Sequence, residues 1–163
     1  PDDAPAMVRR ISPVYDVSTI SRVTGSVYRN DLLDDGRTKG ITIIAADLNL
    51  INVQRGTLKT GNYLTEVTSQ FPIAVLGSVA AERLAIDDLS VKPRLWIGDQ
   101  WFTVGGILDP LPLAADLDRA AIIGSGSAEK VFDHEGDTDV IYVRAYPDIV
   151  QYVRSVIAAT VNP

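Results

Sequence analysis

Residues 61–108 decide the fold of this chain. The segment opens with GNYLTE from Gly61, continues as PIAVLGSVAAERL from Pro72, and closes with LWIGDQWFTVGGIL from Leu95. A glycine turn, a continuous apolar run, an alanine-rich stretch and two apolar runs around a Gly-Asp-Gln tripeptide follow one another. Such short apolar runs between turn residues are typical of strands, and the alanine-rich stretch favours a helix.

This order predicts a turn, a strand, a helix and a β-hairpin. We expect the strand over residues 73–76 and the helix from Ser78 to about Ile86, with the Ser78 hydroxyl capping its free N–H groups. The apolar runs 95–97 and 101–107 form the hairpin, whose loop is 98–100.

The N-terminal part predicts strands. Residues 14–29 and 41–46 are rich in β-branched and aromatic side chains and form a hairpin, whose tip contains Asp34, Asp35 and Gly36. A short helical turn capped by Asp47 follows. The first residues, up to Pro13, read as the end of a helix that began upstream of residue 1.

The C-terminal part alternates between strands and helices. A loop over 109–118 leads to a buried strand over 120–123, and a helix capped by Ser125 or Ser127 ends near Asp133. Residues 138–145 alternate in polarity, which predicts a strand with two different faces. Pro147 opens the last helix, whose apolar stripe is Ile149, Val153, Val156 and Ile157. The sequence therefore predicts an α+β fold with a mixed sheet.

Composition excludes several classes of function. Of 163 residues, 46% are hydrophobic and 22% charged, which suits one folded domain, and no apolar run approaches the ~20 residues of a membrane helix. The net charge of −6 repels a phosphate backbone and argues against nucleic-acid binding. The absence of cysteine excludes disulfides, thiolate nucleophiles and cysteine-based zinc sites.

Two motifs invite a catalytic interpretation that the sequence does not support. His134, the single histidine, stands in an acidic run that has neither zinc-site spacing nor the EF-hand pattern, so a solvated acidic turn is favoured. The run from Gly124 to Ala128 has neither the order of a nucleophile elbow nor the lysine of a P-loop, and helix capping explains its serines. We expect no catalytic residue, no metal and no cofactor.

Contact with a partner is the remaining role for individual side chains. Trp96 and Trp101 bracket the hairpin turn around Asp99, and cross-strand packing is favoured for them over an exposed partner contact. The loop over 109–118 carries three leucines that either form an exposed contact surface or anchor the loop inwards: Leu111, Leu113 and Leu117.

Taken together, these segments resemble the extracytoplasmic core domain of MacB-like and FtsX-like ABC transporter permeases. The resemblance covers the chain from about Ile11 to its end and depends on the order and spacing of four short patterns. Their matching residues are Ile43–Val53 with Asp47; Gly61, Leu64 and Glu66; Ala74, Val75, Leu76, Gly77, Ala81 and Leu84; and Ile97, Gly98, Phe102, Val104, Gly106, Ile107 and Leu108. Residues 140–161 resemble the last strand and the helix that returns to the membrane.

The resemblance implies a non-catalytic domain outside the membrane, in which βαβ-type units form two small lobes. It implies a membrane-proximal lobe made of residues 1–60 and 125–163, and an inserted lobe over 61–124. Transmembrane helices would flank both ends, and an ATP-binding subunit or domain in the cytoplasm would drive the domain. An adaptor, a lipoprotein or a cell-wall enzyme would be its partner outside the membrane.

Two other classes of function stay open. A freestanding secreted ligand-binding module would show ligand-induced thermal shifts. A small serine hydrolase using Ser125 or Ser127 with His134 would react with a serine-directed phosphonate.

Overall fold

The computed structural model describes residues 4–30, 40–134 and 137–161. Its helices, with short 3-10 turns labelled η, and its strands follow in chain order: α1 (Ala4–Arg9), β1 (Val14–Val23), β2 (Val27–Tyr28), β3 (Thr42–Ala46), α2 (Leu50–Val53), β4 (Leu58–Gly61), η2 (Thr68–Gln70), β5 (Ile73–Leu76), α3 (Ser78–Arg83), β6 (Arg94–Ile97), β7 (Gln100–Leu108), η3 (Leu117–Arg119), β8 (Ala120–Gly124), α4 (Ser125–Phe132), β9 (Val140–Ala145), η4 (Pro147–Ile149) and α5 (Val150–Val161).

One mixed sheet of nine strands joins these elements in the order β2-β6-β7-β5-β8-β3-β1-β9, with β4 paired to β7. The pairs β3–β8 and β5–β7 are parallel, and the other pairs are antiparallel. The chain passes from β5 to its parallel neighbour β7 through α3 and β6. The predicted α+β fold with a mixed sheet and βαβ-type units is therefore confirmed.

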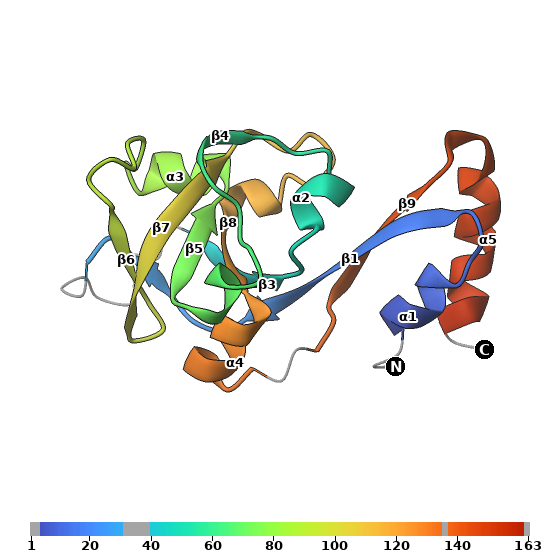
Figure 1. Cartoon of the computed structure of the whole chain (residues 1–163), viewed down its shortest axis with the longest axis horizontal. Helices are drawn as coiled ribbons and strands as arrows, with labels where there is room; N and C mark the ends of the chain where they lie inside the picture. Colours follow the sequence, from blue (N-terminus) through green and yellow to red (C-terminus); the bar gives the residue numbers. More distant parts are fainter. Residues whose placement is uncertain (1–3, 31–39, 135–136, 162–163) are drawn as a thin grey trace.

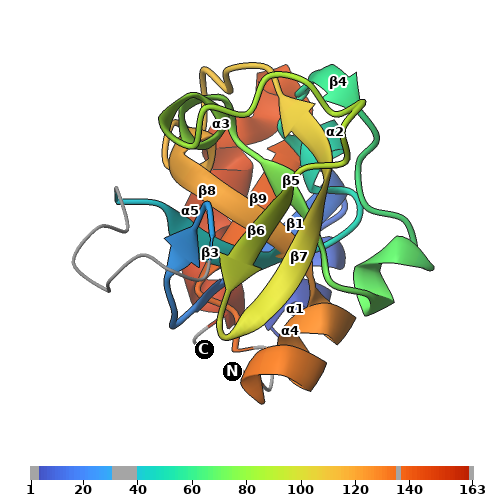
Figure 2. The same cartoon turned by 90° about the vertical axis from the view of Figure 1, so that its left-hand side faces the viewer.

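The molecule is elongated (Figure 1). Most of the sheet lies at one end with α2, α3 and α4 around it, which Figure 2 shows from that end. β1 and β9 run together from this body to the other end, where α1 and α5 pack beside them and where both ends of the chain lie. The register of this ribbon pairs Val17 with Val143 and Ile20 with Val140.

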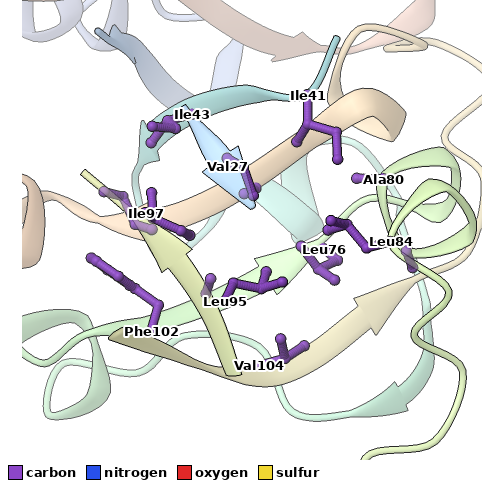
Figure 3. Close-up of a cluster of buried hydrophobic side chains, with 14 of the residues drawn as sticks. Val27, Ile41, Ile43, Leu76, Ala80, Leu84, Leu95, Ile97, Phe102 and Val104 are labelled. Carbon is purple, nitrogen blue, oxygen red and sulfur yellow. The ribbon is translucent and has the colours of Figure 1, made fainter. Parts of the chain in front are cut away.

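Two hydrophobic clusters form the core, one on each face of the central strands. Figure 3 shows the first cluster, in which Leu76, Leu95, Ile97, Phe102 and Val104 meet. The second contains side chains that alternate with these along the same strands and their neighbours, namely Ile20, Ile44, Val75, Leu108, Ile122 and others. Because β5 and β8 contribute to both clusters, their sequences are apolar at every position instead of alternating.

The hairpin of β6 and β7 closes with a two-residue turn. Gly98 and Asp99 have φ angles of +54° and +62°, the positive values that a type I′ turn requires at both central positions. Gln100 pairs with Ile97 and therefore belongs to β7, so the loop is one residue shorter than predicted.

The predicted side-chain caps of three helices are wrong. Asn49, Gly77 and Gly124 occupy the N-cap positions of α2, α3 and α4, and none of these helices has a side-chain cap hydrogen bond. Asp47, expected to cap α2, accepts hydrogen bonds from the backbone N–H and the hydroxyl of Thr19 instead, at 2.8 and 2.9 Å.

Close packing explains why Ser78, Ser125 and Ser127 lie inside their helices instead of capping them. A Cβ atom on Gly77 would lie 2.1 Å from the carbonyl oxygen of Leu117, and one on Gly124 would lie 2.4 Å from Ser69. The 3-10 turns η3 and η2 therefore leave room only for glycine at the two strand-to-helix junctions.

α3 is shorter than predicted, because it ends at Arg83 instead of about Ile86. Ala85 takes a left-handed conformation with φ +52°, and the N–H of Ile86 donates to the carbonyl of Ala81 at 2.9 Å. This is the geometry that commonly terminates a helix.

Three features of the outer elements differ from the sequence prediction or complete it. β9 begins at Val140 and is half-buried throughout, without the predicted alternation, since it pairs only with β1 at the sheet edge. η4 precedes α5, and Val153 alone of the predicted stripe is deeply buried, with 3% exposure. The predicted antiparallel pairing of β1 with β3 is confirmed. The predicted tip of that hairpin, with Asp34, Asp35 and Gly36, lies outside the described residues.

The division into two lobes stays a prediction. β3, from the first proposed lobe, pairs in parallel with β8 of the second, and β2 of the first lobe pairs antiparallel with β6 of the second. The sheet is therefore continuous across the proposed boundaries.

We expect Gly98→Ala to destabilise the protein by more than about 2 kcal/mol. The added Cβ would require a left-handed alanine and would lie 2.0 Å from the ring of Phe132. Denaturant unfolding measures the change. Asp99→Gly is the matched control in the same turn, and we expect it to keep or raise stability. Equal stability of Gly98→Ala and the parent chain would contradict this account of the turn.

Candidate functional site

The tryptophans at the tip of the β6–β7 hairpin pack against each other. Trp96 and Trp101 stand directly opposite on the two strands, with ring centroids 5.2 Å apart and an edge-to-face angle of 67°. The guanidinium of Arg94 lies 5.2 Å from the Trp101 ring centroid. Their neighbours Leu95 and Phe102 point into the core, so the two indoles lie on the outer face, where both are half-buried.

Asp99 is exposed at the tip of this hairpin. The strands β6 and β7 of this hairpin lie at the end of the molecule opposite α1 and α5 (Figure 1). The favoured cross-strand packing of the tryptophans is therefore present, and the outer face of the hairpin still offers two aromatic side chains and a carboxylate to a partner.

The loop over 109–118 exposes one of its three leucines. Leu113 is 83% exposed, whereas Leu111 and Leu117 are 3% and 0% exposed and belong to the second core cluster. Asp118 holds the loop inwards, because its carboxylate accepts a hydrogen bond from the N–H of Leu111 at 2.9 Å. The prediction of an exposed contact surface is therefore wrong for Leu111 and Leu117, because both side chains anchor the loop inwards.

His134 reaches a residue that the sequence did not single out. Its Nε2 atom forms a hydrogen-bond contact with the hydroxyl of Ser21, which comes from β1, 113 positions earlier in the chain. The two side chains line a cavity of about 140 Å³ together with Thr19, Ile20, Ala45, Ala46, Asp47, Ser125 and Thr138. No local pattern around Ser21 could have revealed this pairing, because only the fold brings β1 next to the end of α4.

The candidate hydrolase serines lie differently around His134. Ser125 lines the same cavity, but Ser127 is fully buried and its hydroxyl lacks a hydrogen-bond partner. Within the described part of the chain, no carboxylate accepts a hydrogen bond from the His134 ring. A serine nucleophile needs a base that a third group orients. The described residues supply a serine–histidine contact without that third group.

Tyr63 is half-buried, but its hydroxyl is fully buried and feels the charge of Asp47. Its hydroxyl has no hydrogen-bond partner, and its ring packs against the second core cluster. Burial and, to a smaller extent, the charge of Asp47 raise the pKa of Tyr63 well above its ordinary value. The phenol is therefore held neutral.

Within residues 4–30, 40–134 and 137–161, no cluster of three or more His, Cys, Asp or Glu side chains could hold a metal ion. None of the helices described is long and apolar enough to cross a bilayer.

Comparison with solved structures relates the whole fold to domains of transporters. The extracellular domain of the ABC-type transporter YknZ from Gram-positive bacteria matches with a TM-score of 0.73 and 14% identity, over 99% of this chain and 81% of that domain. The periplasmic region of MacB from Actinobacillus actinomycetemcomitans matches with a TM-score of 0.68 and 14% identity, over 97% and 71% of the two chains.

A domain of a permease protein from Porphyromonas gingivalis matches with a TM-score of 0.61 and 17% identity, over 96% of this chain and 67% of that domain. No protein-family model matches the sequence, and no curated protein is significantly similar to it in sequence.

These comparisons define the class of fold. The chain has the fold of the extracytoplasmic domains of ABC transporter permeases. The resemblance seen in the sequence patterns is therefore confirmed at the level of the fold.

We expect Tyr63→Phe to raise stability at neutral pH by about 1 kcal/mol, because it removes a buried hydroxyl without a partner. The raised pKa also costs stability at alkaline pH. The unfolded phenol ionises from about pH 10 while the folded one stays neutral, so stability falls by about 1.4 kcal/mol per pH unit above that point. Tyr63→Phe has no phenol at this position, so its stability lacks this decrease at alkaline pH.

Denaturant unfolding between pH 7 and pH 11 measures both effects. Tyr152→Phe is the control, since Tyr152 is 57% exposed and no change is expected. A loss of stability in Tyr63→Phe at pH 7 would show that its hydroxyl makes a favourable interaction after all.

Proposed function

We propose that this chain is the extracytoplasmic domain of an ABC transporter permease. Likeness of the whole fold carries the proposal: three transporter domains match 96–99% of the chain with TM-scores of 0.61–0.73. The domain does no chemistry in this role. It couples ATP hydrolysis by a cytoplasmic subunit to a conformational change outside the membrane, and to the engagement of a substrate or partner protein.

The arrangement of the chain ends supports this role. α1 and α5 lie side by side at one end of the molecule, and both chain ends lie there too (Figure 1). Transmembrane helices attached at these two points would move α1 and α5 together. The β1–β9 ribbon would then transmit that motion to the body of the sheet, because antiparallel pairing couples the two strands along their length.

The lobes and the partner surface belong to the same proposal. Residues 1–60 and 125–163 form the membrane-proximal lobe, and residues 61–124 form the inserted one. The contact surface for an adaptor, lipoprotein or cell-wall enzyme includes Trp96, Asp99 and Trp101, because these side chains are accessible on the hairpin at the end far from the chain termini. Leu113 would form a separate contact, because its loop follows the end of β7 opposite to the hairpin turn.

A single cysteine tests the location of the domain. The chain has no cysteine, so Leu113→Cys in the full-length protein, with any cysteine elsewhere replaced, introduces one exposed thiol. We expect a membrane-impermeant maleimide to label it in intact cells, or in a Gram-negative cell once the outer membrane is opened.

Leu117→Cys is the matched control, since Leu117 is fully buried in the same loop and stays unlabelled in the folded protein. Labelling of Leu113→Cys only after the inner membrane is lysed would place the domain in the cytoplasm and refute the proposal.

A further inference from the structure

A groove of about 700 Å³ lies between α3 and the strands β4 and β7. Small-molecule sites in proteins commonly have volumes of ~300–1,000 Å³. The residues that line the groove come from α3, from the turn after it, and from the ends of the two strands: Lys59, Ser78, Ala81, Glu82, Ala85, Ile86, Asp87, Ile107, Leu108, Asp109 and Pro110.

The floor of the groove is apolar and firmly packed. Ala81, Ile86, Ile107 and Leu108 are each no more than 4% exposed. Ile107 and Leu108 belong to the two clusters of the core, so the floor is held in place by the core. The apolar side chains of the lining that a ligand can reach are those of Ala85 and Pro110, both exposed. A ligand that packs against them lies above a floor that it does not have to order.

The rim of the groove is acidic. Glu82 and Asp87 are exposed, and neither carboxylate has a hydrogen-bond or ion-pair partner in the described part of the chain. Asp109 is half-buried and accepts a hydrogen bond from the Thr57 hydroxyl at 2.6 Å. With Lys59 as the one cation in the lining, three carboxylates leave the groove with two negative charges in excess.

We propose that this groove binds a small organic cation with an apolar body. The apolar part packs against Ala85 and Pro110 above the floor, and the positive charge lies among the carboxylates at the rim. Carboxylates beside a low-dielectric surface concentrate cations and repel anions, so an anion of the same shape is rejected. The proposal depends on the groove alone and not on the transporter role.

Two probes of equal shape and opposite charge test the site on the 163-residue chain. Tetraphenylphosphonium and tetraphenylborate are titrated separately, with isothermal titration calorimetry for affinity and amide chemical shifts for location. We expect the cation to bind at least about tenfold more tightly than the anion, with shifts in α3, residues 84–87 and 107–110. We also expect affinity for the cation to fall as salt rises.

A double variant that reverses two charges at the rim tests whether the carboxylates bind the cation. Glu82→Lys with Asp87→Lys alters exposed side chains only, and we expect at least about a tenfold loss of affinity for the cation. Glu66→Lys with Asp148→Lys changes the net charge equally at exposed positions outside the groove lining, and keeps the affinity.

Three results would overturn the proposal. These are equal affinity for both probes, shifts that lie elsewhere, and equal losses in the two double variants, which would show a general charge effect. None of them changes the expected labelling of Leu113→Cys, so the proposed function fails or stands separately.

Discussion

The pairing of β8 with its two neighbours holds the structure together. β8 is parallel to β3 on one side and antiparallel to β5 on the other, and all five of its residues are buried. Without this strand the sheet would separate into a group containing β1, β3 and β9 and a group containing β2, β4, β5, β6 and β7. Because β5 and β8 bury both faces, each core cluster depends on the same backbone hydrogen bonds, and loss of one cluster would expose the other.

The positions of the other elements follow from this centre. η2 and η3 pack on the two strand-to-helix junctions that end β8 and β5, which is why glycine and not a capping side chain occupies each junction. Outwards from the centre, the ribbon of β1 and β9 becomes the only part of the described sheet that reaches α1 and α5 (Figure 1). Both the accessible hairpin tip and the acidic groove lie on the body of the sheet, away from the packed pair α1 and α5. The proposed function, in which motion enters at one end and a partner binds at the other, would use this arrangement.

The sequence predicted the fold better than it predicted the site. Strands and the hairpin were readable from continuous apolar runs and from Gly98 and Asp99, because these signals are local. The helix N-caps were not readable from the sequence. Gly77 and Gly124, and not the serines after them, occupy these positions because distant backbone segments pack there. The contact of His134 with Ser21 could not be predicted either, nor could the burial of Leu111 beside the exposed Leu113, because both depend on the folded chain. In an irregular loop no period indicates which side chain turns inwards, and a side-chain contact between residues 113 positions apart leaves no local pattern.

Hydrogen–deuterium exchange of the 163-residue chain, read amide by amide, tests the central place of β8 most directly. Protection in a folded chain is highest where opening requires global unfolding. We expect the amides of β5 and β8 to exchange last and together, with rates set by global stability. The outer half of the ribbon, near Val14 and Ala145, is expected to exchange earlier. Fast exchange in β8 while the ribbon stays protected would contradict the account, because the sheet would then have its stable centre elsewhere.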